Sequence, residues 1–93
     1  MDKRKLRVGD VVIGEYGFWV VTARARTGSC LAAPLSCVKK RSNWGTMGVV
    51  TKQEVNENDI LFNLCENKWA NFGDEDLTER LVVRATEEKK ERP

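Results

Sequence analysis

The stretch FWVVTARARTGSCLAAPLSCV, residues 18–38, decides the fold, because it has the form of two strands joined by a tight turn. Its first half alternates along the chain, as a strand with one buried face does. The side predicted to face inward carries Trp19, Val21, Ala23 and Ala25, and the opposite side carries Val20, Thr22, Arg24 and Arg26. Residues 26–29 form the predicted turn, in which Gly28 is free to adopt a positive φ. Residues 30–38 are the predicted return strand.

Pro34 interrupts this return strand. Proline has no backbone N–H to donate to a neighbouring strand, so it is confined to edges and bulges of a sheet. We therefore expect residues 30–38 to form an edge strand or to carry a bulge at Pro34. Because exposed edges are usually covered or paired, the same observation predicts a homodimer.

Further strands are predicted on either side of this hairpin, at residues 7–14, 49–55 and 81–85. Two structures remain open for residues 60–72. The spacing of their apolar residues fits a helix that ends before Gly73. Turn-forming residues at 66–68 favour instead a hairpin of strands 60–65 and 69–72, which is the alternative that we prefer.

The strand count predicts the fold class. Five or six short strands favour a mainly β (β or α+β) protein, with a small, strongly bent sheet or an SH3-like barrel and at most one short helix. The alternative is an α+β sheet that carries one helix on a face. Residues 7–86 form the single predicted domain, between a flexible basic N-terminus over residues 1–6 and a disordered charged tail over residues 87–93.

Several classes of function are excluded by composition. The sequence has no histidine, which removes imidazole bases, Ser-His and Cys-His pairs and histidine metal ligands. Cys30, Cys37 and Cys65 form no CxxC pair, so we expect three free thiols and a cytoplasmic location. No apolar run approaches the roughly 20 residues of a membrane span. We accordingly expect no cofactor, no metal, no membrane association and no enzymatic activity.

Charge is distributed unevenly along the chain, although the net charge is only +2. Residues 1–41 contain nine Lys and Arg against three Asp and Glu, whereas residues 42–93 contain seven against eleven. This asymmetry is typical of a face that binds a polyanion. The alternative, which we prefer at this point, is that the two halves neutralise each other, in the fold or in a head-to-tail contact between two copies.

A basic loop supplies the candidate contacts to nucleic acid. The sequence KKRSNW over residues 39–44 places three cations, which suit phosphates, next to an aromatic ring on which a base can stack. Two outward-facing arginines of the first strand would extend the patch. The candidate residues are Arg24, Arg26, Lys39, Lys40, Arg41 and Trp44. The alternative is a solvated hairpin tip whose Trp44 folds back onto the core.

Three segments, GDVV (9–12), WVVT (19–22) and APLS (33–36), resemble the PemK/MazF ribonuclease toxins over about the first 40 residues. Those proteins are small dimeric barrels. Their catalysis uses an Arg next to Pro before the second strand and a Ser or Thr at the end of the third. Ser36 stands at the latter position, whereas Tyr16, Gly17 and Phe18 stand where the Arg-Pro pair is expected.

The sequence therefore predicts a small non-enzymatic binding module, with nucleic acid as the first candidate partner. A protein-interaction or inhibitor module, such as an accessory protein of a mobile element, is the alternative. A divergent ribonuclease of the PemK/MazF type is the third.

Overall fold

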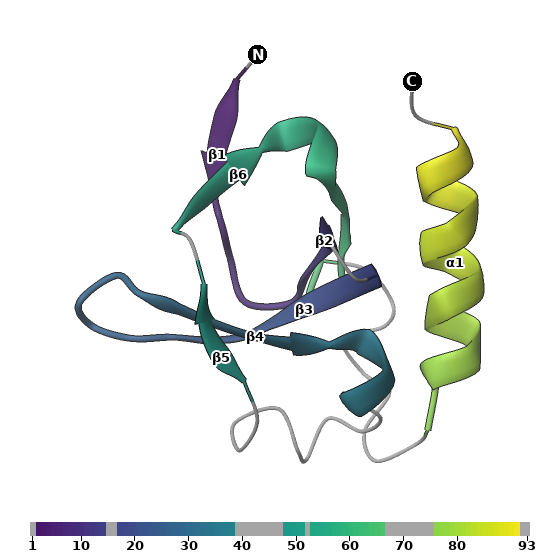
Figure 1. Cartoon of the computed structure of the whole chain (residues 1–93), viewed down its shortest axis with the longest axis horizontal. Helices are drawn as coiled ribbons and strands as arrows, with labels where there is room; N and C mark the ends of the chain where they lie inside the picture. Colours follow the sequence, from purple (N-terminus) through teal and green to yellow (C-terminus); the bar gives the residue numbers. More distant parts are fainter. Residues whose placement is uncertain (1, 15–16, 39–47, 52, 67–75, 92–93) are drawn as a thin grey trace.

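The computed structural model describes residues 2–14, 17–38, 48–51, 53–66 and 76–91. Within these residues the chain forms seven strands in two antiparallel sheets, followed by one α-helix (Figure 1). The strands are β1 (Lys3–Lys5), β2 (Asp10–Gly14), β3 (Gly17–Arg24), β4 (Cys30–Pro34), β5 (Val49–Thr51), β6 (Glu54–Asn56) and β7 (Ile60–Asn63). The helix is α1 (Thr78–Lys90). The prediction of a small, mainly β protein is confirmed.

The larger sheet has five strands in the order β5-β4-β3-β2-β7, and β1 pairs with β6 in a separate two-stranded sheet. In the part of the chain that the structure describes, the sheets do not close into a barrel, because β5 and β6 belong to different sheets. The strand predicted over residues 49–55 is thus two short strands. Of the hairpin predicted over residues 60–72, β7 confirms the first strand, and residues 69–72 lie outside the described residues.

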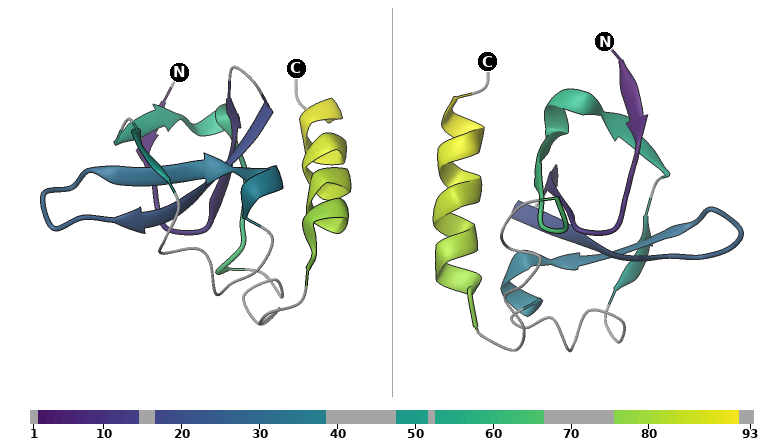
Figure 2. Two further views of the ribbon diagram at one scale, coloured as in Figure 1. Left: turned by 60° about the horizontal axis from the view of Figure 1, so that its bottom comes forward. Right: turned by 180° about the vertical axis from the view of Figure 1, so that it is seen from behind.

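The β3–β4 hairpin forms where the sequence predicts it. Its turn begins at Ala25, whose carbonyl accepts a hydrogen bond of 2.9 Å from the N–H of Gly28. Gly28 adopts a φ of +92°, a conformation that residues with a Cβ rarely take. The hairpin projects away from the side of the molecule where α1 lies (Figures 1 and 2).

The predicted division of β3 into an inner and an outer face is wrong, because both faces of this strand are covered. Val20 packs in a cluster with α1, whereas the adjacent Val21 packs in a second cluster with Leu6 and Ile60. Both valines are fully buried. Alternation predicts a solvated face only where one side of a sheet meets water, and only the two ends of β3, at Gly17 and Arg24, are exposed.

Pro34 is the last residue of β4, and it pairs with Trp19 of β3. On its other side β4 pairs with β5, but only through Cys30–Ala32. The prediction that β4 is an edge strand is therefore wrong, although Pro34 itself lies beyond the part that β5 covers. The register irregularity falls between Val21 and Ala23 of β3, not at the proline. A 3₁₀ helix, η1 (Leu35–Cys37), replaces the rest of the predicted strand.

The strand predicted over residues 81–85 is wrong, since these residues belong to α1. Leu77, Leu81 and Ala85 are spaced four apart and are all buried in the core beside the five-stranded sheet. This tertiary packing outweighs the strand preference of the two valines that follow Leu81.

Both predicted tails contain regular structure. The helix continues through Lys90, and a hydrogen-bonded ion pair of 3.1 Å between Arg84 and Glu88 supports its last turns. At the other end of the chain, Lys3–Lys5 form β1 instead of a flexible terminus. No helix among the described residues has the length and apolar character needed to cross a membrane. No disulfide bond joins any two of the three cysteines, as predicted.

Candidate nucleic-acid interface

A buried carboxylate organises the end of the molecule where the chain begins. Asp10, the first residue of β2, is fully buried. Its Oδ2 accepts a hydrogen bond of 2.7 Å from the backbone N–H of Arg7. Its Oδ1 accepts hydrogen bonds from Nδ2 of Asn63 at 2.8 Å and from Nη2 of Arg4 at 3.2 Å. These partners replace the water that a buried carboxylate loses.

Asn63 ties the end of β7 to the segment that leads into β2. Its Nδ2 also donates to the carbonyl of Val8 at 3.1 Å, while its Oδ1 accepts from the N–H groups of Cys65 at 2.7 Å and Glu66 at 3.0 Å. Gly9 lies in the same place with a φ of +92°, and an added Cβ would meet Sγ of Cys65 at 2.9 Å. Asp10, Asn63 and Gly9 therefore fix how the N-terminal segment sits on the sheet.

This anchoring sets the direction of the side chains on β1. Arg4 turns inward to Asp10 and pairs across the ladder with Val55. Because successive side chains of a strand point to opposite faces, Lys3 and Lys5 point outward, and both are exposed. The buried network thus presents two lysines to solvent.

Arg24 joins these lysines from the far end of β3. Its Nη1 donates to the carbonyl of Leu6 at 3.4 Å, which places the guanidinium next to the residue that follows β1. Arg26 is exposed in the adjacent turn. We call the four residues Lys3, Lys5, Arg24 and Arg26 the cationic surface. Glu54 of β6 pairs across the ladder with Lys5 and offsets part of its charge.

The cationic surface differs from the neighbouring arginines Arg4 and Arg7 in ion pairing. Arg4 forms an ion pair with Asp10, and Arg7 forms one of 2.8 Å with Glu66. Within the described ranges, no member of the cationic surface forms an ion pair. Charges without such a partner remain available to phosphates.

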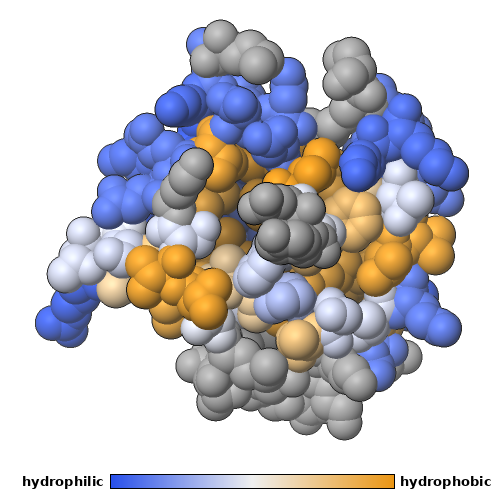
Figure 3. All heavy atoms as spheres, viewed as in Figure 1, coloured by the Kyte–Doolittle hydropathy of each residue, from blue (hydrophilic) through white to orange (hydrophobic). Residues whose placement is uncertain are grey.

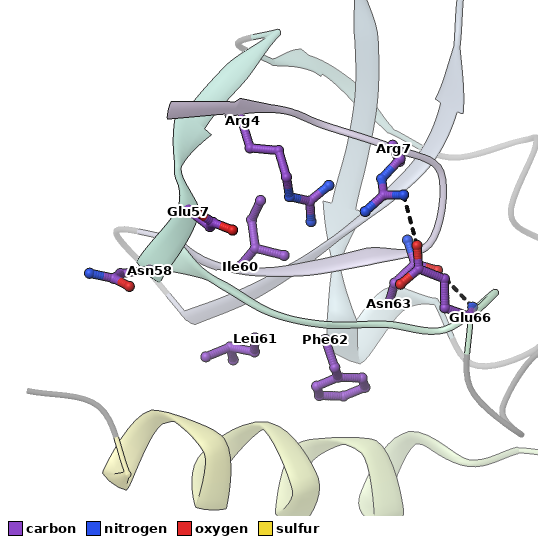
Figure 4. A pocket seen from close by; sticks show the side chains of 9 residues that line it. All are labelled: Arg4, Arg7, Glu57, Asn58, Ile60, Leu61, Phe62, Asn63 and Glu66. Carbon is purple, nitrogen blue, oxygen red and sulfur yellow. Dashed lines mark hydrogen bonds and ion pairs between the residues drawn. The ribbon is translucent and has the colours of Figure 1, made fainter. Parts of the chain in front are cut away.

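A polar pocket of about 460 Å³ lies next to this surface, between the N-terminal segment and β7 (Figure 4). Arg4 and Arg7 both extend into the pocket, and Phe62 lies on the side of β7 toward α1. Since Asp10 and Glu66 neutralise the two guanidiniums and Glu57 adds a further carboxylate, this pocket does not concentrate positive charge. It is a weaker anion site than the exposed surface beside it.

The predicted contacts divide into two groups. Arg24 and Arg26 are exposed, near the tip of the β3–β4 hairpin, as predicted. The others, Lys39, Lys40, Arg41 and Trp44, lie outside the described residues.

Sequence reasoning missed Lys3 and Lys5, which it assigned to a flexible terminus. No local signal marks these residues as a strand, because Lys3, Arg4 and Lys5 are all charged and show no alternation of polar and apolar side chains. Sequence reasoning also missed the pairing of Asp10 with Asn63, for which no local signal exists, because 53 positions separate them.

Two further results bear on what the site can do. No group of His, Cys, Asp or Glu suited to a metal ion occurs in the part of the chain that the structure describes. Comparison with protein-family models, with curated proteins and with solved structures gives no match for this chain.

Proposed function

We propose that the protein is a small nucleic-acid-binding module that contacts phosphates through the cationic surface. The observation that supports this most is the contrast in pairing. Arg4 and Arg7 are bound to acids, whereas Lys3, Lys5, Arg24 and Arg26 are exposed without one among the described residues. The buried Asp10 network and the bond from Arg24 to Leu6 place these cations on the surface.

The proposed binding is to the backbone more than to particular bases. Exposed Lys and Arg side chains neutralise phosphates and release counterions, which gives affinity without sequence preference. We propose that Lys39, Lys40 and Arg41 add further phosphate contacts. Trp44 would stack on an unpaired base, so we propose a preference for single strands.

Fluorescence anisotropy with labelled single-stranded RNA and DNA tests this proposal. The double variant Lys3→Gln/Lys5→Gln removes two charges of the cationic surface. At 0.15 M salt we expect its affinity to fall by about tenfold, from two lost phosphate contacts. The matched control is Lys89→Gln/Lys90→Gln, which removes two exposed charges from the last turn of α1 and is expected to bind as the wild type does.

The proposal fails if the control weakens binding as much as the test variant, because the effect would then reflect net charge alone. It fails also if the wild type shows no binding at tens of micromolar protein. A labelled RNA that is cut during the titration would instead support the divergent ribonuclease, and Ser36, exposed on η1, would be the first residue to replace.

A second candidate function is a protein-interaction module. It is favoured by Val49 and Val50 of β5, whose exposed fractions are 59% and 72%. Neighbouring valines exposed on the last strand of a sheet are typical of an interaction surface. If nucleic-acid binding is absent, this function takes first place.

A further inference from the structure

β5 forms one edge of the five-stranded sheet. Its inner side pairs with β4, and no other strand among the described residues pairs with its outer side. An edge strand directs unpaired N–H and C=O groups outward, where another extended chain can add to the sheet. In the part of the chain that the structure describes, the outer side of β5 is therefore open to strand addition.

The side chains of β5 leave this edge unprotected. Val49 shares a face with its ladder partner Ala32, and Val50 shares the opposite face with Leu31. Because both valines are largely exposed, neither face of the sheet is covered at β5. Residues 48–51 (GVVT) contain no charged residue, although 32% of the chain is charged.

β7 forms the opposite edge of the same sheet, and charged residues lie beside it. Next to β7 lie Arg7 and Glu57, and Glu66 pairs with Arg7 there. Charges at an edge discourage the addition of a foreign strand. Their presence near β7 and their absence from residues 48–51 identify β5 as the edge at which association is favourable.

An apolar groove opens beside β5. A cavity of about 490 Å³ lies between the two sheets, where they fail to close, and Leu6, Trp19, Val21 and Val55 are among its lining residues. Figure 3 shows hydrophobic surface on this side of the molecule, bordered by hydrophilic residues. Val49 lies at the border of the groove, so a strand added to β5 would cover its outer rim.

We propose that β5 pairs with β5 of a second copy, antiparallel and about a two-fold axis at Val50. In this arrangement Val50 faces its own counterpart, and Val49 faces Thr51 of the partner on the groove side. No charged residue faces another across these pairs. Each copy supplies an uncharged, β-branched strand that pairs with the open side of β5 in the other copy. A net charge of only +2 per chain opposes the association little.

Sedimentation analysis of Val50→Lys tests the pairing. The wild type is expected at about twice the monomer mass of 10.6 kDa. Two lysines facing each other across the axis should weaken the dimer at least tenfold, because like charges at an interface cost several kcal/mol. The matched control is Val83→Lys on α1, where 56% of the valine is exposed, and it should remain dimeric. Thermal unfolding verifies that both variants fold.

A cross-link locates the axis. Opposite residues in an antiparallel pair are about 4.5–5.5 Å apart between Cα atoms, within the range of a disulfide. Val50→Cys, in a Cys37→Ser/Cys65→Ser background, should form a covalent dimer on oxidation, and Val83→Cys should not. A wild type that is monomeric at all concentrations overturns the proposal. In that case the partner of β5 would be a strand of a different protein. A dimer that survives Val50→Lys and does not cross-link through position 50 also overturns it.

Discussion

Asp10 connects residues that lie far apart in the sequence, since it bonds to Arg4, to the backbone of Arg7 and to Asn63. Every one of these partners donates a hydrogen bond. The carboxylate therefore fits because it only accepts hydrogen bonds and carries a charge opposite to that of Arg4. The orientation of β1, and with it the cationic surface, depends on this residue.

We expect Asp10→Asn to lower the free energy of unfolding by about 3 kcal/mol. The NH₂ group of the new asparagine would face one of the groups that now donate a hydrogen bond to Asp10, and Arg4 would lose the negative charge that it pairs with. Arg4→Gln should cost about 1 kcal/mol, because 26% of the arginine side chain is exposed and the group is partly hydrated. Urea unfolding measures both values. Equal effects would show that the ion pair, and not the acceptor geometry of Asp10, gives the network its stability.

The cysteines provide a second test at this scale. Cys65 is exposed, Cys37 is partly buried and Cys30 is fully buried in the core, and none of the three is bonded to another. In the folded protein we expect a thiol reagent to modify Cys65 first and Cys30 last. Denatured, unreduced protein should show three reactive thiols. A single reactive thiol would mean that two cysteines are joined.

Among the elements, α1 packs on one face of the five-stranded sheet through a small number of buried side chains. Leu81 is buried against this face, whereas Val83, two positions along, is exposed. Leu81→Ala should lower the free energy of unfolding by about 3 kcal/mol, through lost burial and the cavity that remains. Val83→Ala should change it by less than about 0.5 kcal/mol. If urea unfolding gives the same small change for both, α1 does not pack on the sheet as the structure indicates.

The sequence predicts elements well where local signals agree. Between residues 18 and 34 the β-branched residues and the turn glycine both favour a hairpin, and β3 and β4 follow. It fails where packing decides. Leu81-Val82-Val83 favours a strand locally, but the spacing of Leu77, Leu81 and Ala85 buries one face of a helix. That spacing was present in the sequence, and the valines obscured it.

The candidate site was predictable only in part, for a similar reason. Arg24 and Arg26 follow from the hairpin, because the end of a hairpin is exposed wherever the hairpin lies. Lys3 and Lys5 could not be placed without β6, whose residues pair with those of β1 across 49 to 53 positions of sequence. Contacts between distant segments, such as Asp10 with Asn63, leave no periodic pattern in the sequence.

At the scale of the whole molecule, the uneven charge of the two halves acquires a partial explanation. Part of the excess positive charge of the first half is neutralised by the fold, because Glu66 from the second half pairs with Arg7. The pair of Arg4 with Asp10 lies within the first half. The remainder described by the structure is gathered at β1 and at the end of β3. This division is what a polyanion-binding face requires, and it is why we give nucleic acid precedence over self-neutralisation.

The loop sequence allows phosphate contacts to be separated from stacking. Trp44→Ala should weaken binding to single strands by roughly 1–3 kcal/mol without altering its salt dependence, if a base stacks on the ring. Lys39→Gln/Lys40→Gln/Arg41→Gln should weaken binding to all sequences alike. Anisotropy titrations measure both effects. If Trp44→Ala instead lowers the unfolding temperature and leaves the affinity of the folded protein unchanged, the ring belongs to the core.

The salt dependence of binding is the sharpest test of phosphate contact by the cationic surface, because it counts the contacts. For single-stranded RNA, the slope of log affinity against log salt concentration changes by about 0.7 for each contact. Replacing Lys3, Lys5, Arg24 and Arg26 by Gln should therefore make the slope shallower by about 3. A four-residue variant that binds more weakly but keeps the wild-type slope, or one that binds as the wild type does, would contradict the assignment of these residues as phosphate contacts.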